Sequence, residues 1–232
     1  MKVRGVMIFG MMLMATTAIA AEKMELKTPK DKVSYAIGMD MANSLKQNNI
    51  DVSPDILGKA IKDVLTGQQL VMTDDEAKAS LMNLQKEMQD KQQSEMKAVG
   101  DKNVKEGDAF LAENKKKDGV KTTASGLQYQ VMAEGKGKSP KETDMVTVQY
   151  KGTLLDGTEF DSSYVRGQPA TFPVNGVIKG WTEALQLMKE GAKWKLFIPA
   201  GLAYGESGTQ GGPIGPNATL IFEVELVSVQ EK

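Results

Sequence analysis

The stretch MVTVQYKGTLLDGTEFD, residues 145–161, decides how the C-terminal half of this chain folds. Its apolar residues Val146, Val148 and Tyr150 alternate with polar ones, a period of two that is typical of a strand with one buried face. Asp156 and Gly157 then supply turn residues before a second strand. The stretch therefore predicts an antiparallel hairpin.

The same alternation recurs elsewhere in the C-terminal half. It covers three further segments, at 127–131, 194–198 and 220–226. Residues 182–188 instead carry Ala184, Leu185 and Met188 between flanking glycines, the pattern of a single short helix. Antiparallel strands packed on one helix form an α+β layer arrangement, and we expect this fold class here.

Aromatic residues divide the chain into two parts. Beyond the first twenty residues, only Tyr35 and Phe110 precede Tyr129, while both tryptophans follow it. This shift predicts a helical module over residues 21–118 and a second domain over residues 119–232.

Three helices are expected in the N-terminal module. The first has apolar residues four positions apart on one face: Val33, Ile37, Met41 and Leu45. The second starts with Ser53 as N-cap and Pro54 at its first position, and Gly67 is a fitting C-cap. The third opens with a capping box formed by Thr73 and Glu76.

The third helix is expected to be long and exposed. Apolar residues thin out beyond Met88, which predicts a solvated connecting segment. Gly100 and Gly107 each cost a helix about 1 kcal/mol relative to Ala, so they mark candidate positions for a bend or break. Phe110 and Leu111 are candidates to pack the segment against the second domain.

The N-terminal module has little apolar surface with which to build a core. Small domains bury a low fraction of their surface, and association often completes them. We therefore predict dimerisation through these helices. A monomeric helical stalk is the alternative, because an apolar face at helical spacing does not specify its partner.

The first twenty residues have the build of a secretory signal peptide. Lys2 and Arg4 precede an apolar run at 6–14, and Ala18 and Ala20 frame a cleavage site. That run is too short to span a bilayer, which takes about 20 residues. We expect cleavage after Ala20 and export to the periplasm, with an uncleaved anchor as the alternative.

Composition excludes several function classes. The 232 residues contain no Cys and no His, which removes thiol nucleophiles, Ser-His-Asp triads and His-based metal sites. The formal net charge of −1, with acids and lysines interspersed, lacks the basic footprint of nucleic-acid binding. We expect no cofactor, no metal and no nucleic-acid partner.

Four ordered segments carry a specific family resemblance. They are YKGTLLDGTEFD at 150–161, VIKGW at 177–181, LAYG at 202–205 and ATLIF at 218–222. In this order and spacing, they resemble an FKBP-type peptidyl-prolyl cis-trans isomerase from about Gly119 to the C-terminus. The resemblance implies an antiparallel half-barrel sheet wrapped on one helix.

The resemblance also implies a set of site residues. The catalytic candidates are Tyr150, Phe160, Asp161 and Tyr204, and the substrate-binding candidates are Val177, Ile178, Trp181, Ile214 and Phe222. In the family, the residue matching Trp181 forms the floor, and the N–H matching Ile178 and the hydroxyl matching Tyr204 bind substrate carbonyl oxygens. Asp161 is expected to orient groups near the rotating amide. Without the resemblance, the core of an ordinary sheet would be the favoured interpretation of these aromatics.

Two N-terminal segments extend the resemblance to most of the mature chain. IDVSP at 50–54 and GDAFLAEN at 107–114 look like the Mip group (macrophage infectivity potentiator) of bacterial FKBP-type enzymes, which implies a homodimer through the N-terminal helices. The resemblance implies that the clients are proline-containing exported polypeptides. It also implies that macrolides are candidate inhibitors. Ala170, where many members have a wall aromatic, widens one wall for such ligands. A dimeric periplasmic holdase chaperone is the alternative function, and outer-membrane or cell-surface association is an alternative location.

Overall fold

The computed structural model describes residues 24–231 and divides into two compact units, one ending at Thr73 and one beginning at Asp74. The predicted signal peptide, residues 1–20, lies outside the described residues. The predicted domain boundary after residue 118 stays a prediction. No helix within residues 24–231 is long and apolar enough to cross a membrane.

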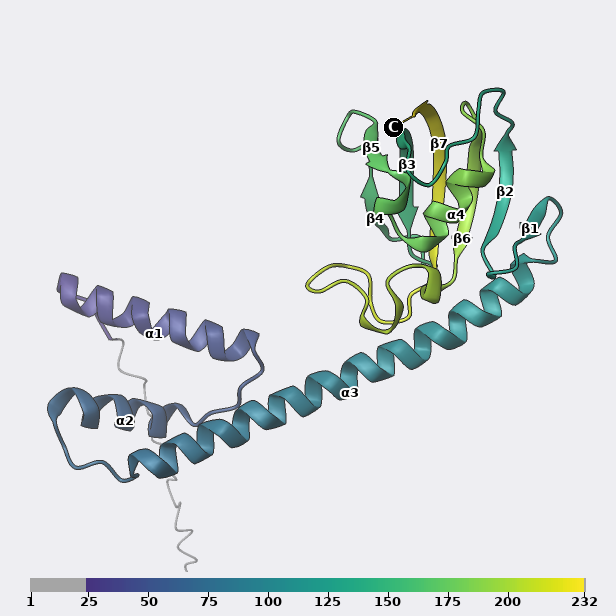
Figure 1. The fold of residues 1–232 in the computed structure, drawn as a ribbon. Helices are drawn as coiled ribbons and strands as arrows, with labels where there is room; N and C mark the ends of the chain where they lie inside the picture. Colours follow the sequence, from purple (N-terminus) through teal and green to yellow (C-terminus); the bar gives the residue numbers. More distant parts are fainter. Residues whose placement is uncertain (1–23, 232) are drawn as a thin grey trace, which may run out of the picture. The chain divides into compact units, whose positions relative to one another are not determined.

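The first unit contains two helices with side-chain caps (Figure 1). In α1 (Pro29–Gln47), the Thr28 hydroxyl accepts from the Asp31 N–H at 3.1 Å, and the Asp31 carboxylate accepts from the Thr28 N–H at 2.8 Å. In α2 (Pro54–Thr66), Ser53 is the N-cap and Gly67 closes the helix at φ +65°, as predicted. No residue of α1 is buried, so the predicted apolar face is left in solvent.

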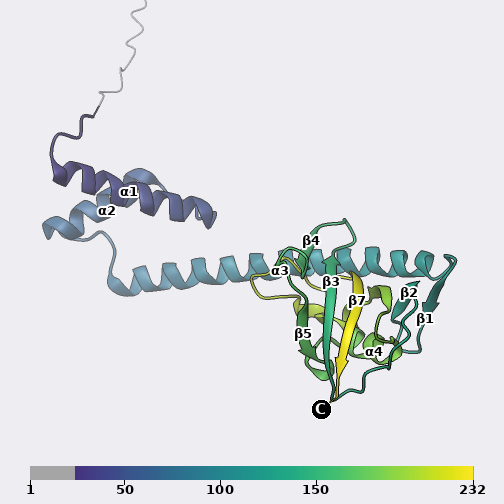
Figure 2. The same ribbon diagram turned by 90° about the horizontal axis from the view of Figure 1, so that it is seen from above.

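The second unit begins with α3 (Asp74–Asn114), a single helix of 41 residues that leads into β1 (Figure 2). The expected bend or break at Gly100 or Gly107 is wrong, because the helix is continuous and both glycines are buried. A Cβ at Gly107 would lie 2.3 Å from the Thr219 Oγ1. Phe110 packs on Phe197 with ring centroids 5.8 Å apart, in agreement with the expected packing. The glycines therefore mark close contacts and not a hinge.

Seven strands form one antiparallel sheet, which confirms the predicted α+β class. They are β1 (Val120–Thr122), β2 (Gln128–Ala133), β3 (Met145–Thr153), β4 (Glu159–Ser162), β5 (Ala170–Pro173), β6 (Lys193–Ile198) and β7 (Leu220–Gln230). Their order is β1-β2-β6-β7-β3-β4, and β5 pairs with the free half of β3. The 145–161 hairpin is β3 and β4, and Gly157 takes φ +87° in its turn.

The sheet curves around α4 (Lys179–Leu187), as Figure 1 shows. This helix starts three residues earlier than predicted, since Ile178 makes no side-chain cap that would signal the start. Ala184 and Leu185 are completely or almost completely buried against the concave face of the sheet. Three short 3-10 turns complete the unit: η1 (Val174–Gly176), η2 (Ala200–Leu202) and η3 (Gly205–Ser207). This core fixes the positions of the residues around one mouth of the half-barrel.

Candidate active site

A cavity of about 690 Å³ opens at one end of the half-barrel. Its lining residues are Tyr150, Phe160, Asp161, Phe172, Gly176, Val177, Ile178, Trp181, Tyr204, Thr209, Gly212, Pro213, Ile214 and Phe222. All nine site residues expected from the sequence are in this set. The structure therefore brings together residues that lie up to 72 positions apart in the chain.

Aromatic rings form the floor and walls of the cavity. Trp181, at the start of α4, lies 5.1 Å from the Tyr150 ring at 89° and 5.2 Å from the Phe222 ring at 81°. Phe160 meets Phe222 edge-on at 5.4 Å. Edge-to-face rings at such distances attract through their quadrupoles, which stabilises the arrangement beyond its buried area. The alternating aromatics thus serve both as core and as cavity wall.

Gly152 of β3 makes room for two of these walls. It pairs with Phe222 of β7 across the sheet. A Cβ at this position would lie 2.7 Å from the rings of both Phe160 and Phe222. The absence of a side chain here lets the two rings approach each other over the strand.

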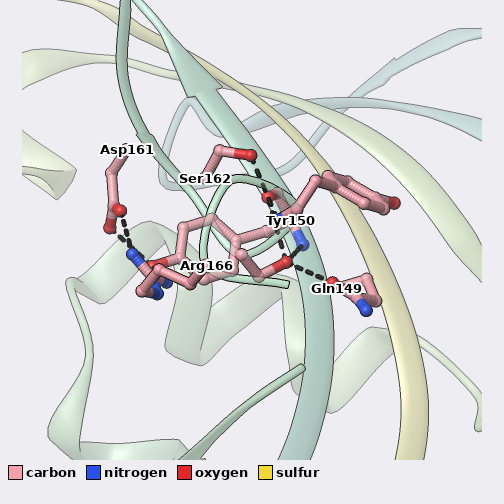
Figure 3. Close-up of polar contacts among 7 residues, drawn as sticks. Gln149, Tyr150, Asp161, Ser162 and Arg166 are labelled. Atoms are coloured by element: carbon pink, nitrogen blue, oxygen red, sulfur yellow. Dashed lines mark hydrogen bonds and ion pairs between the residues drawn. The ribbon is translucent and has the colours of Figure 1, made fainter. Parts of the chain in front are cut away.

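Polar groups gather at one edge of the cavity (Figure 3). The Tyr150 hydroxyl donates to the Asp161 carboxylate at 2.5 Å and accepts from the Arg166 guanidinium at 2.5 Å. Arg166 also forms an ion pair with the other carboxylate oxygen of Asp161. The three side chains therefore make a closed network between β3, β4 and the loop after β4.

This network fixes the charge state of its members. Burial raises the pKa of Tyr150, and its hydrogen bond to Asp161 raises it further. Burial alone would raise the pKa of Asp161, but the hydrogen bonds from Tyr150 and Arg166 outweigh it and hold that pKa below its usual value. Tyr150 is neutral and Asp161 is ionised at neutral pH.

Ser163 holds the strand that carries Tyr150. Its hydroxyl accepts from the Tyr150 N–H at 2.8 Å and donates to the Gln149 side chain, while its own N–H donates to the Tyr150 carbonyl at 3.0 Å. Ser163 is completely buried. Tyr150 is thus positioned through its backbone as well as through its hydroxyl.

Comparison with known proteins gives this arrangement a family. A model described as FKBP-type peptidyl-prolyl cis-trans isomerase matches residues 136–227, and a model described as the domain amino terminal to it matches residues 30–131. The chain is 47% identical over 218 residues to the Outer membrane protein MIP of Legionella longbeachae, covering 94% of this chain and 93% of that protein. The chain belongs to the FKBP-type peptidyl-prolyl isomerase family.

Two further members are similar over most of their length. The peptidyl-prolyl cis-trans isomerase Mip of Coxiella burnetii is 47% identical, with 95% of each chain covered. The crystal structure of FkpA from Escherichia coli superposes with a TM-score of 0.73 at 40% identity, covering 89% of this chain and 99% of that chain. The resemblance to the Mip group is therefore confirmed over both the helical module and the sheet domain.

Two further hydrogen-bond donors lie at the cavity. The Ile178 N–H, just before α4, has no hydrogen-bond acceptor within residues 24–231. The Tyr204 side chain is 41% exposed at the rim. Each offers a donor to a carbonyl oxygen of a polypeptide in the cavity, but their roles stay predictions.

The candidates from the sequence did not include Arg166 or five lining residues of the cavity: Phe172, Gly176, Thr209, Gly212 and Pro213. Arg166 lies five positions after Asp161, and an isolated arginine in a loop gives no pattern that predicts its ion pair. Phe172 lines the cavity from β5, with its ring 6.3 Å from that of Trp181. This strand has four residues, too few for alternation to predict it from the sequence. Ala170 itself is not among the lining residues.

Proposed function

We propose that this FKBP-type enzyme accelerates cis–trans rotation of X-Pro bonds in exported polypeptides, with the proline bound in the aromatic cavity. The observation that carries the proposal is the cavity itself, with Trp181 as its floor and Tyr150, Phe160 and Phe222 as its walls. Such a surface fits the compact, apolar proline ring.

The chemistry requires no acid, base or nucleophile. Rotation about a peptide bond faces a barrier of about 18–20 kcal/mol because the planar amide is stabilised by resonance. A twisted amide has lost that resonance, so its oxygen carries less charge than in the planar form. An apolar, water-poor cavity therefore disfavours the planar ground state relative to the twisted state, which lowers the barrier.

The polar groups at the rim orient the substrate chain. The Ile178 N–H and the Tyr204 hydroxyl each donate to a substrate carbonyl oxygen next to the proline. Asp161, held ionised by Tyr150 and Arg166, places a fixed negative charge beside the rotating bond. A fixed charge and fixed donors need no reorganisation during rotation, so they hold the substrate chain in position while the amide twists.

The N-terminal module supports a second part of the proposal, a homodimer. Val33 and Ile37 of α1 are 58% and 59% exposed, and Ile56 and Leu65 of α2 are 71% and 80% exposed. Apolar faces of this extent on two capped helices are typical of an interface. We propose that a second copy of the chain covers them.

Export and ligand preference complete the proposal. Signal-peptide cleavage after Ala20 would deliver the enzyme to the periplasm, where proline-containing exported polypeptides are its clients, with outer-membrane association as an alternative. A cavity of this size and apolar character is also compatible with macrolide inhibitors.

The experiment that tests the function is cis-to-trans conversion of a short X-Pro peptide. We expect acceleration by the native protein and loss of most of it in the double variant Asp161→Ala/Tyr204→Phe, with native near-ultraviolet circular dichroism in both. If folded native protein gives no acceleration, the isomerase proposal is wrong and the holdase chaperone becomes the better account.

A further inference from the structure

The loop between β6 and β7 lines the cavity on one face and contacts α3 on the other. One face lines the cavity through Thr209, Gly212, Pro213 and Ile214. The loop is closed by its own hydrogen bonds, from the Thr209 N–H to the Ile214 carbonyl at 2.8 Å and from the Asn217 N–H to the Gly205 carbonyl at 2.8 Å. These bonds connect the two sides of the loop, so a contact on its second face bears on the position of its first face.

The second face rests on α3 (Figure 1). The Asn103 side-chain amide donates to the Pro216 carbonyl at 2.7 Å. A Cβ at Gly100 would lie 3.3 Å from both the Pro216 Cβ and the Asn217 Nδ2, so the helix backbone comes within contact distance of the loop. Gly107 makes the same kind of close approach to Thr219, where the loop enters β7.

The contact residues of α3 form one continuous stripe. They follow each other at steps of three, four, three and four positions: Gly100, Asn103, Gly107, Phe110 and Asn114. This spacing places them on a single face of the helix. At the end of the stripe, the Asn114 side chain donates to Gln128 at 3.0 Å, and Gln128 donates to the Leu111 carbonyl at 2.9 Å.

The composition of the stripe is unusual for a helix. Glycine is the least favourable helix residue apart from proline, and asparagine is also unfavourable. Both residue types stand here where the loop comes closest or accepts a hydrogen bond. Gly100, Asn103 and Gly107 therefore match the loop and its entry into β7, while Phe110 and Asn114 contact β6 and β2.

We propose that α3 is a structural part of the isomerase site, and that Asn103 is a positioning residue that holds the 205–217 loop in its substrate-binding position. This inference rests on the proposed function. The loop forms a wall of the cavity but does not carry the Tyr150–Asp161–Arg166 network. If the loop is released, the cavity binds the planar and the twisted amide less tightly by the same free energy. KM for the substrate then rises, and kcat stays nearly unchanged.

The test compares full-length variants that remove the amide donor. Asn103→Ala removes the side chain, and Asn103→Asp keeps its shape but replaces the donor with an acceptor. Asn83→Ala is the matched control, because Asn83 is an exposed position on the same helix. Alanine favours the helix over asparagine at both positions, so a loss of helix stability does not confuse the comparison.

We expect KM for an X-Pro peptide to rise about three- to tenfold in both Asn103 variants, the effect of one hydrogen bond, with kcat within about twofold of native. Asn83→Ala should match the native enzyme. Amide hydrogen exchange in the 205–217 loop should accelerate several-fold in the Asn103 variants alone.

The other outcomes separate the two proposals. If KM of the Asn103 variants equals that of the native enzyme, the positioning role is wrong, whether or not loop exchange changes. If the native protein shows no isomerase activity, the proposed function fails on its own. Loop exchange and the affinity of an X-Pro peptide then decide the positioning role, and unchanged values in Asn103→Ala would overturn it.

Discussion

Replacing Tyr150 by phenylalanine separates the two uses of this side chain. The ring would still pack against Trp181 at 5.1 Å and Phe172 at 6.2 Å, so the cavity keeps its apolar wall. Only the hydroxyl is lost, and with it the 2.5 Å hydrogen bonds to Asp161 and from Arg166. The change therefore tests the polar network without opening a cavity in the core.

The structure sets the size of the expected effect. A hydrogen bond to a charged group contributes about 1.5–3 kcal/mol when it is buried. The Arg166 and Asp161 side chains are 44% and 42% exposed, so water replaces part of what is lost and screens the rest. The Arg166–Asp161 ion pair also survives. We expect a loss of about 1 kcal/mol in transition-state stabilisation, which is about a fivefold lower kcat/KM.

The assay is cis-to-trans conversion of an X-Pro peptide, followed at several enzyme concentrations. Tyr164→Phe is the matched control, because it removes the same hydroxyl from a half-exposed side chain in the loop after β4 that does not line the cavity. The control should keep native kcat/KM within about twofold. Urea unfolding of both variants would show whether the fold is retained.

Two results would refute this reasoning. Native kcat/KM in Tyr150→Phe would mean that the hydroxyl does not position Asp161 for catalysis. A decrease in kcat/KM of about a hundredfold or more would exceed what the loss of these half-exposed hydrogen bonds can explain. It would mean that the hydroxyl acts directly on the substrate.

Four further predictions concern the site and the N-terminal helices. Activity should not change between about pH 5 and pH 9. The lowered pKa of Asp161 keeps its carboxylate ionised down to acidic pH, and the raised pKa of Tyr150 keeps its hydroxyl neutral up to alkaline pH. A bell-shaped pH–rate profile would contradict this. The stabilising contribution of Asp161 should be complete above about pH 4 and fall as pH drops through its folded pKa, as acid unfolding would measure. Gly152→Ala should lower kcat/KM at least tenfold, because its Cβ would lie 2.7 Å from both wall phenylalanines, and a native rate would show that the rings can move away freely. Ile37→Glu should halve the mass measured by sedimentation and leave peptide isomerisation unchanged, whereas Lys32→Glu on another face should not; an unchanged mass would exclude this face from the interface.

Period and turn chemistry predicted much of the sheet domain. The alternation at Val146, Val148 and Tyr150 marked β3, and Asp156 with Gly157 marked its turn, because both signals are local to the segment. Strands β1 and β5 were not predicted, since three or four residues are too few to show a period of two. Their places depend on pairing with β2 and β3, which is information from elsewhere in the chain.

The candidate site was predictable as a set of residues but not as a network. The four ordered family segments contain eight of the nine expected cavity residues, all but Ile214. Nothing in the sequence joined Arg166 to Tyr150 across sixteen positions. That contact depends on how the loop after β4 folds back over β3. Local propensity does not report such a contact, and only the folded sheet creates it.

The glycines of α3 explain why reasoning from propensity failed in that helix. Propensity scales treat each residue as if it faced water, where Gly100 and Gly107 only weaken the helix. Both residues face the loop that enters β7, and a side chain at Gly107 would collide with Thr219. The contact that removes the glycines' disadvantage also ties the helix to the cavity wall. Because any such coupling is reciprocal, a ligand that stabilises the loop must stabilise its contact with α3 by the same free energy. A helix that sequence alone predicts to be a spacer is thereby expected to respond when the cavity is filled.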